Sequence, residues 1–405
     1  MKNVYRPVRA SFVDCNLRFL NTNRFRNTSY LTAVWEVVKN GNILLAADEA
    51  ILDIEPECTK DFPVEVSYPS EHCDIHINIY YYDGDEEVAF EQIALFEEFC
   101  YDFEKSKSAV DFADGDDVAR FDFEGGNVSF SKTSGMIESY VTNGKEMIND
   151  APAYAKGFIP NIYRALLDND AHPRDKWINA GYDDYVCKCI GFEVKKSKKR
   201  KAEVEVTYKL KSAKTKLAIA KVVVVYKIYA DGYIRIKADF SPLTKILVAA
   251  DMPRFGLTLE MPEKFTNVEY YGLGDCENLP DFRAQSIVGV YNTTVADMHE
   301  PYIKPQDGGN RCEVRYVAIT DDEGDGLKFG FNEKHFNFNV RNYTQKLLQD
   351  AKHQEDLHSE NTTVVNIDGF TRGTGTSSCG PDVLDKYVVN GRRGLEFSFW
   401  MMPAK

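Results

Sequence analysis

Apolar and polar residues alternate along much of the chain, which is the pattern of strands that keep one face in a core. Residues 75–81 place Ile or Tyr at every second position, and Asp83-Gly84 then turns the chain. Residues 204–210 and 336–340 alternate in the same way, and Asn40-Gly41 supplies a further turn. Alternation that ends in Asn-Gly or Asp-Gly is a strong short-range signal for a β-hairpin. Many short strands with frequent turns predict an all-β protein built from β-sandwiches.

Helical patterns are scarce. The best candidate helix begins near Asn342, which can cap it, and runs about three turns toward His353, with its apolar residues on one face. A (β/α)8 barrel needs about 250 residues and a helix after every strand. Because the helical half of that pattern is almost missing, the sequence predicts no TIM barrel.

A change in composition marks a domain boundary near residues 100–118. Lysine and serine residues are followed there by an acidic, glycine-containing stretch, which is typical of a linker. We therefore expect two β-sandwich domains, an Ig-like one over residues 1–105 and a large antiparallel supersandwich over residues 106–405.

Composition narrows the classes of partner and location. Lys and Arg total 49 against 63 Asp and Glu, a net charge of −14 that argues against nucleic acid as the partner. No run approaches 18 apolar residues, and no signal core follows the first residues, so we expect neither a membrane partner nor secretion. Nine scattered cysteines fit free thiols in a cytoplasmic protein.

Common catalytic and phosphate-binding motifs are missing from the sequence, and neither Cys187-x-Cys189 nor His72 with His76 has further metal ligands nearby. More informative are four polar segments, three of them too long and glycine-rich for tight turns. They cover residues 163–170, 271–283, 301–312 and 365–381. Long ordered loops on a rigid sandwich usually carry binding groups. The alternative is that Asx turns and Arg–carboxylate pairs merely hold these loops in shape.

These segments resemble the C-terminal region of glycoside hydrolase family 2 β-galactosidases. The residues that carry the resemblance are Arg164 to Asp170, Tyr271-Gly-Leu-Gly274 with Glu277-Asn278 and Pro280-Asp281, Tyr302 with Pro305-Gln306-Asp307 and Gly309, and Asp368-Gly369-Phe370 through Cys379-Gly380-Pro381. The family's counterparts have the same chain order, and residues 5–36 look like the sandwich that follows its catalytic barrel. Leu166 replaces a family Pro, and Cys379 stands where some members have a Trp that stacks on the sugar.

The resemblance implies a supporting role. Family members are retaining glycosidases whose two catalytic Glu, like most of their Mg2+ and Na+ ligands, lie on the barrel. The implied chain is therefore a non-catalytic C-terminal part of a β-galactosidase, inactive alone and without a cofactor or metal of its own. It packs on the barrel of the same or a partner chain, forms homo-oligomers and walls the galactoside site. The candidate wall residues are Arg164, Asp168, Asn169, Asp170, Asn310, Arg311, His353, Arg372, Ser378 and Cys379.

Other readings of the sequence stay open. The chain is either a fragment of a longer enzyme or a separately encoded small subunit, and its N-terminal sandwich favours a fragment. It is alternatively a stand-alone carbohydrate-binding or scaffold module. A third class is an independent hydrolase that uses its own carboxylates, such as Asp168 and Glu277, although no local acid–base pair is evident.

Overall fold

Strands dominate both compact units of the protein. The computed structural model describes residues 2–66, 72–101, 103, 108–198, 201–243 and 251–404. The first unit is Met1–Asp102 with Tyr271–Asp275 and Ala284–Tyr291, and the second is Phe103–Tyr270 with Cys276–Arg283 and Asn292–Lys405. The predicted all-β class is confirmed, and no sheet of the described residues closes into a barrel.

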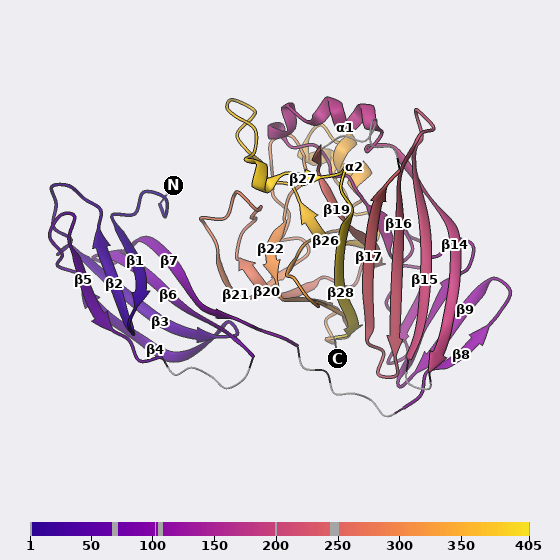
Figure 1. Ribbon diagram of the computed structural model, residues 1–405, viewed down its shortest axis with the longest axis horizontal. Coiled ribbons are helices and arrows are strands. Elements are labelled where there is room, and N and C mark those ends of the chain that lie inside the picture. The colour runs from indigo at the N-terminus through magenta and orange to yellow at the C-terminus, as the bar shows by residue number, and fades with distance from the viewer. Residues whose placement is uncertain are drawn as a thin grey trace. The chain divides into compact units, whose positions relative to one another are not determined.

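The first unit is a small β-sandwich (Figure 1). One sheet has the order β4-β3-β6-β7 and the other the order β1-β2-β5. Phe19 from one sheet and Trp35 and Tyr81 from the other share one buried core, because the alternating pattern turns every second side chain inward. The strands are β1 (Val8–Val13), β2 (Asn16–Asn21), β3 (Leu31–Lys39), β4 (Asn42–Ile51), β5 (Thr59–Pro63), β6 (Asp74–Asp83) and β7 (Glu86–Glu97).

The Asn-Gly turn has the expected form. Asn40 and Gly41 join β3 to β4 with positive φ angles of 50° and 78°. Positive φ at both central residues matches the twist of the strands and favours Asn followed by Gly.

The second unit is a larger antiparallel assembly of layered sheets. Its largest sheet has the strand order β14-β15-β16-β17-β28-β24-β23 within this unit, and the first four of these strands are long. Two five-stranded sheets, β13-β19-β26-β25-β22 and β12-β11-β10-β9-β8, accompany it, and β18 pairs with β27. β20 (Asn267–Gly274) and β21 (Ile287–Thr294) contain residues of both units.

The strands that lie wholly in the second unit have the following bounds. They are β8 (Asp111–Asp114), β9 (Val118–Phe123), β10 (Gly126–Ser131), β11 (Ile137–Thr142), β12 (Lys145–Glu146), β13 (Ile159–Asn161), β14 (Tyr185–Lys198), β15 (Lys201–Ser212), β16 (Ala218–Tyr229), β17 (Ile234–Pro242), β18 (Asp251–Met252), β19 (Arg254–Pro262), β22 (Arg311–Val314), β23 (Tyr316–Thr320), β24 (Gly326–Phe331), β25 (Phe336–Arg341), β26 (Thr362–Thr371), β27 (Val389–Asn390) and β28 (Leu395–Pro403).

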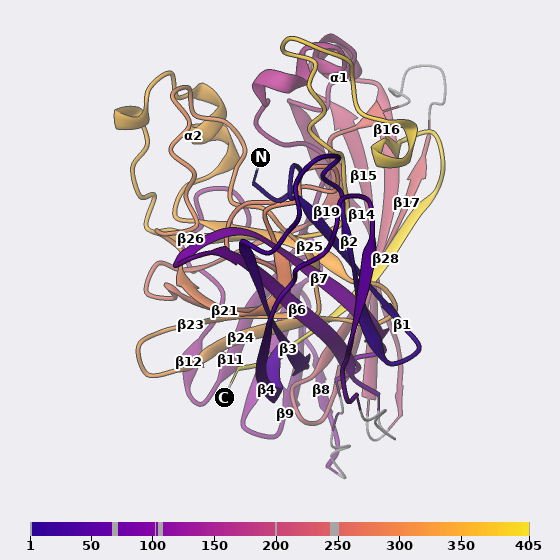
Figure 2. The same ribbon diagram turned by 90° about the vertical axis from the view of Figure 1, so that its left-hand side faces the viewer.

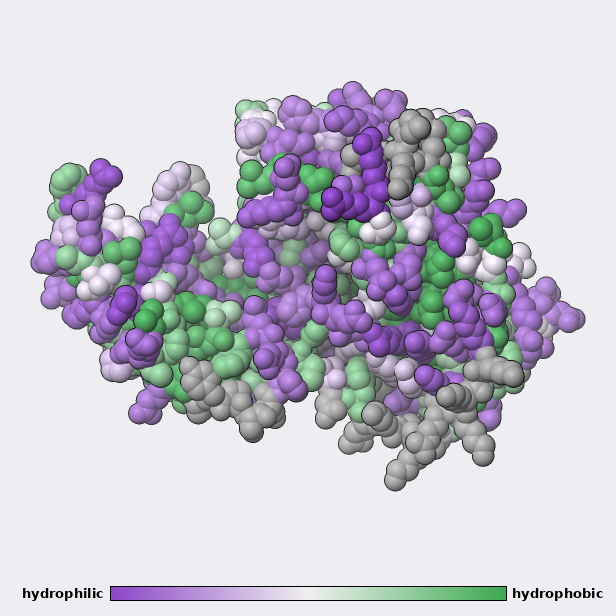
Figure 3. Space-filling view, viewed as in Figure 1, coloured by the Kyte–Doolittle hydropathy of each residue, from purple (hydrophilic) through white to green (hydrophobic). Residues whose placement is uncertain are grey.

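Aromatic side chains join the layers of the second unit. Phe130 of β10 packs on Tyr226 of β16, with ring centroids 5.0 Å apart. Phe255 of β19 lies 5.3 Å from Phe240 of β17. Both smaller sheets therefore pack on the large sheet, whose strands Figure 2 shows from a second side, and buried aromatic residues lie between the layers. On the face seen in Figure 3, hydrophilic residues predominate, in keeping with the charged composition.

The expected helix is shorter than the sequence indicates. It is α2 (Gln345–Asp350), and Thr344 caps it in place of Asn342, since its hydroxyl accepts a hydrogen bond from Leu347 N at 3.2 Å. It ends at Ala351, where the backbone returns to an extended conformation. The sequence analysis missed α1 (Arg174–Ala180). None of the described helices is long and apolar enough to span a membrane.

Candidate functional site

The four polar segments meet in the second unit, where residues 164–170, 277–283, 302–312 and 368–382 form what we name the loop cluster. Asp281 accepts hydrogen bonds from the backbone N–H groups of Thr374 and Gly375, at 2.7 and 2.8 Å. Gly373 permits this approach, because a Cβ there would lie 2.6 Å from the Asp281 carboxyl group. The glycine-rich segment is thus fixed by a carboxylate from a distant loop.

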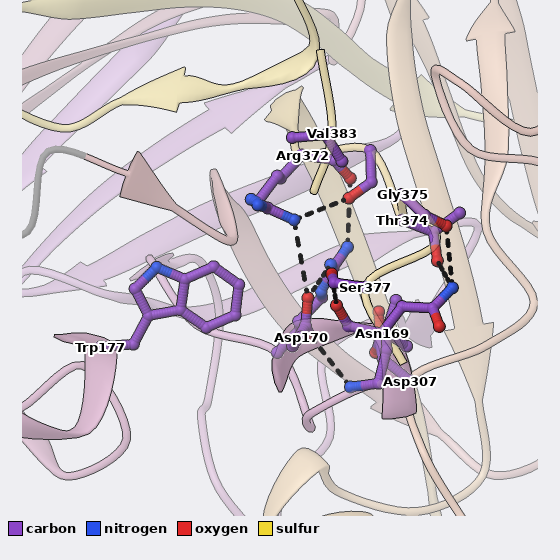
Figure 4. A network of polar contacts seen from close by, with 12 residues as sticks. Asn169, Asp170, Trp177, Asp307, Arg372, Thr374, Gly375, Ser377 and Val383 are labelled. Carbon is purple, nitrogen blue, oxygen red and sulfur yellow. Dashed lines mark hydrogen bonds and ion pairs between the residues drawn. The ribbon is translucent and has the colours of Figure 1, made fainter. Parts of the chain in front are cut away.

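Asn169 ties a second pair of loops together. Its side-chain amide donates to the carbonyl of Gly375 at 2.9 Å and to the Thr374 hydroxyl at 3.2 Å. The Ser377 hydroxyl donates in turn to the Asn169 carbonyl at 2.5 Å (Figure 4). Asp168 N donates to the Gln306 side chain at 2.8 Å, which joins the third loop. The long loops therefore have defined conformations.

A buried ion-pair network lies beneath these contacts. Arg164 donates to Asp170 at 2.9 Å and to the carbonyl of Arg372 at 3.2 Å. Arg372 donates through Nε to both oxygens of Asp251, at 2.8 and 3.0 Å, and through Nη2 to Asp382 at 2.5 Å. Both guanidinium groups are completely buried. Charged groups out of water need such pairing, and bidentate contacts also fix their orientation.

Short helices position the members of this network. Asp170 ends the first turn of the 3-10 helix η1 (Asp168–Ala171), and its second carboxylate oxygen accepts from Leu167 N at 2.9 Å. Trp177 on α1 lies beside Arg372 (Figure 4), with the guanidinium carbon 5.6 Å from the centre of the indole ring, and the indole N–H donates to the carbonyl of Asp251. The missed helix α1 thus supports the cluster directly.

Asp307 is the centre of a second group of buried charges. It lies between the guanidinium groups of Arg254 and Arg341, and Arg341 donates to it at 2.7 Å. Burial alone would raise the pKa of Asp307, but the two arginines lower it below its ordinary value. Asp368 lies 3.4 Å from Arg254, and burial raises its pKa to about 6. Neither Asp368 oxygen accepts a hydrogen bond within the described residues.

Glu277 also holds a loop. Its carboxylate accepts hydrogen bonds from the Tyr302 hydroxyl at 2.5 Å and from Gly309 N at 2.6 Å. Burial raises the pKa of Glu277, although both donors oppose that shift. Asn310 donates from its side chain to the Asn278 carbonyl at 2.8 Å, which joins the same two loops again.

The predicted wall residues fall into two groups. Those that are buried hold the loops: Arg164, Asp170, Asn310, Arg311 and Arg372. Asp168, Ser378 and Cys379 are exposed on the loop cluster, and Asn169 is half-buried. His353 lies at the start of η2 (Gln354–Asp356), where its side chain is exposed and its backbone N–H donates to the Asp356 carboxylate at 3.0 Å. The structure thus brings Asp168, Asn169 and residues 372–379 together but does not bring His353 to them.

Sequence reasoning missed several charged members of the network, namely Arg254, Arg341, Asp251 and Asp382. A signal was present for two of them. Arg254 begins the mostly apolar strand β19 and Arg341 ends β25, and a charge in such a strand indicates a buried partner. Across the described ranges, no group of three or more His, Cys, Asp or Glu lies close enough to hold a metal ion.

Comparisons with known proteins give the family. The family model described as the β-galactosidase small chain matches residues 124–401. The β-galactosidase of Actinobacillus pleuropneumoniae is 28% identical over 96% of this chain and 38% of its own length, and that of Halalkalibacterium halodurans is 30% identical over 67% of this chain and 26% of its own. Among solved structures, galactose 1-epimerase from Lactobacillus acidophilus NCFM aligns over 84% of this chain and 97% of its own, with 10% identity and a TM-score of 0.38. The chain spans less than two fifths of those two β-galactosidases. It belongs to the β-galactosidase small-chain family.

Proposed function

We propose that this chain is the non-catalytic C-terminal part of a β-galactosidase, which packs on the catalytic barrel and walls one side of its galactoside site. The observation that supports the proposal is that four carboxylates of the loop cluster are already hydrogen-bonded or ion-paired within the chain. Asp170, Asp281, Glu277 and Asp307 are each engaged by guanidinium groups or loop N–H groups. A retaining glycosidase needs two carboxyl groups about 5–5.5 Å apart that face the substrate. These four carboxylates instead hold loops.

A rigid loop cluster suits a wall. The loops expose Asp168, Ser378 and Cys379 while their bases are fixed by buried ion pairs. Such a frame presents surface side chains in one arrangement, which limits the entropy lost when a partner or substrate binds.

The proposal also assigns the remaining partners. The chain joins a barrel of the same or a partner chain and forms homo-oligomers, and Mg2+ and Na+ bind on the barrel. A cytoplasmic location is supported by the cysteines, all nine of which are free thiols.

A reconstitution experiment tests the proposal. The full chain is mixed with a barrel-bearing fragment of a β-galactosidase from the same organism, and nitrophenyl-galactoside turnover is measured together with maleimide labelling of Cys379. We expect turnover only after mixing, and slower labelling of Cys379 in the complex, because the exposed cysteine lies on the proposed contact face.

A matched pair of variants tests the wall. Ser378→Trp adds bulk to the loop cluster, and Ser359→Trp adds the same bulk at an exposed position after α2. We expect Ser378→Trp to raise the KM of the reconstituted enzyme and Ser359→Trp to leave it unchanged. Turnover by the chain alone that disappears in Asp168→Asn would contradict the proposal in favour of an independent hydrolase. Failure to bind any barrel fragment would favour a stand-alone module.

A further inference from the structure

A separate recess lies in the second unit, between α2 and the sheet that contains β13, β19 and β26. It is a cavity of about 180 Å³, and none of its lining residues belongs to the loop cluster. Three tyrosines, Tyr154, Tyr182 and Tyr185, contribute to its lining. Cavities for drug-sized ligands measure about 300–1,000 Å³, so this one suits a smaller molecule.

Asn161, Thr258 and Asn366 form the floor of the cavity and belong to a row of polar side chains that crosses neighbouring strands. Thr258 of β19 lies directly opposite Asn366 of β26, which lies opposite Asn339 of β25. Asn161 of β13 donates to both Thr258 and Asn366 at 3.1 Å, and Asn366 donates to Asn339 at 2.6 Å. All four are buried. Amides that are buried and linked in this way have fixed orientations, which prepares the floor for a polar ligand.

Three polar side chains at the cavity have donor or acceptor groups that make no hydrogen bond within the described residues. Gln345 and Gln349 are one turn apart on α2 and therefore share a face, and neither side-chain amide makes a hydrogen bond within the described residues. One oxygen of Asp183 accepts a hydrogen bond from Lys214 at 2.7 Å, while its other oxygen is buried and accepts none from the part of the chain that the structure describes. The cavity wall thus has spare donors and acceptors together.

The charges at the cavity are already paired. Lys214 binds Asp183, and Lys346, which lines the cavity, binds Asp350 at 2.7 Å. Among the described residues that line the wall, Lys346 is the cation, and its pairing with Asp350 leaves it poorly placed to attract a phosphate or carboxylate. Amides, a carboxylate oxygen and tyrosines instead suit hydroxyl groups, which both donate and accept, and an apolar ring face.

We propose that this cavity binds a single neutral pyranose ring, as a free sugar or as the end of a glycan chain. The inference is independent of the proposed role beside a barrel, because every residue involved belongs to this chain. The proposed sugar-binding site is separate from the loop cluster.

Saturation-transfer NMR on the full chain tests the inference. The probes are methyl β-galactoside and methyl β-glucoside as free rings, lactose as a chain end, and glucose 6-phosphate as an anionic ring. Gln345→Ala/Gln349→Ala removes the unused amides with a good helix former, and Lys352→Ala is an exposed control beyond α2. We expect a neutral probe to bind, and the double variant to weaken that binding about tenfold, the loss expected for two hydrogen bonds.

Each outcome decides the inference. Lactose binding more tightly than the methyl glycosides identifies a chain end, and the reverse identifies a free ring. Both support the proposal when Lys352→Ala has no effect. It is overturned if no neutral probe binds, if the double variant binds as well as the unchanged chain, or if glucose 6-phosphate binds as tightly as the neutral rings. Asp183→Asn supplies a second variant, in which weaker binding supports the site and unchanged binding counts against it.

Discussion

Asp307→Asn is the sharpest test of the buried charge network. The substitution keeps the shape of the side chain and removes one negative charge from between Arg254 and Arg341. Arg254 retains Asp368 at 3.4 Å, but that carboxyl group has a pKa raised by burial to about 6 and makes no hydrogen bond to it. Two buried cations thus lose their shared carboxylate.

The size of the effect follows from burial. Removing one partner of a buried ion pair costs about 3–5 kcal/mol, because the remaining charge is left without water or a counter-ion. Both arginines are almost completely buried, and each contacts Asp307 directly. We therefore expect the free energy of unfolding of the second unit to fall by at least about 3 kcal/mol. Asp350→Asn is the control, since its exposed pair with Lys346 is worth less than about 1 kcal/mol.

Urea unfolding followed by tryptophan fluorescence measures this loss. Trp177 and Trp400 belong to the second unit and Trp35 to the first, so a Trp35→Phe background reports on the second unit alone. We expect a lower midpoint with an unchanged slope, which indicates lost stability rather than a changed denatured state. A loss below about 1 kcal/mol for Asp307→Asn, or an equal loss for Asp350→Asn, would refute the argument that burial sets the cost.

Three further predictions use other parts of the cluster. Burial raises the pKa of Asp368 in the folded protein to about 6, so its protonated form stabilises the fold at low pH and this stabilisation is lost as the pH rises from about 4 to 6. Asp368→Asn should therefore remove up to about 3 kcal/mol from the change in unfolding free energy over this pH interval, as measured by urea unfolding. An unchanged dependence of the unfolding free energy on pH would contradict this. Asp281→Ala should speed hydrogen exchange of the backbone amides at 374–375, and equal rates would show that other contacts hold the loop. Maleimide should label exposed Cys379 rapidly and Cys312 only after unfolding, because burial raises the pKa of Cys312 to about 12; rapid labelling of Cys312 in the folded protein would be inconsistent with its burial.

Local patterns predicted the strands well. Val204, Val206 and Tyr208 are fully buried in β15, because alternation along a strand depends only on neighbouring residues and on which face meets the core. The helix near Asn342 was predicted less well, since a cap depends on backbone conformation. Thr344 has the extended conformation of a cap. Of the apolar residues that suggested a helix over 342–353, Leu347 and Leu348 lie in α2, whereas Tyr343 precedes it, and these three pack with Ala165.

The pairing of charges lay beyond local patterns. Arg164 and Arg372 are 208 positions apart, and Asp307 lies 53 positions from Arg254 and 34 from Arg341. A single sequence does not state which distant strands meet, so the partners of these arginines were not predicted. The recess beside α2 was not predicted for the same reason, because Asn161 and Asn366 become neighbours only when β13 and β26 flank β19.

The buried charges explain how long, glycine-rich loops can have one conformation. Apolar contacts are non-directional and leave such loops several packings, whereas a guanidinium group donates in fixed directions. Arg372 contacts Asp251 from β18 and Asp382 from the C-terminal loop, so one side chain sets the position of two segments. Replacing buried ion pairs by apolar residues often costs no stability. We therefore infer that this network mainly positions the exposed residues of the loop cluster, since apolar residues could supply comparable stability.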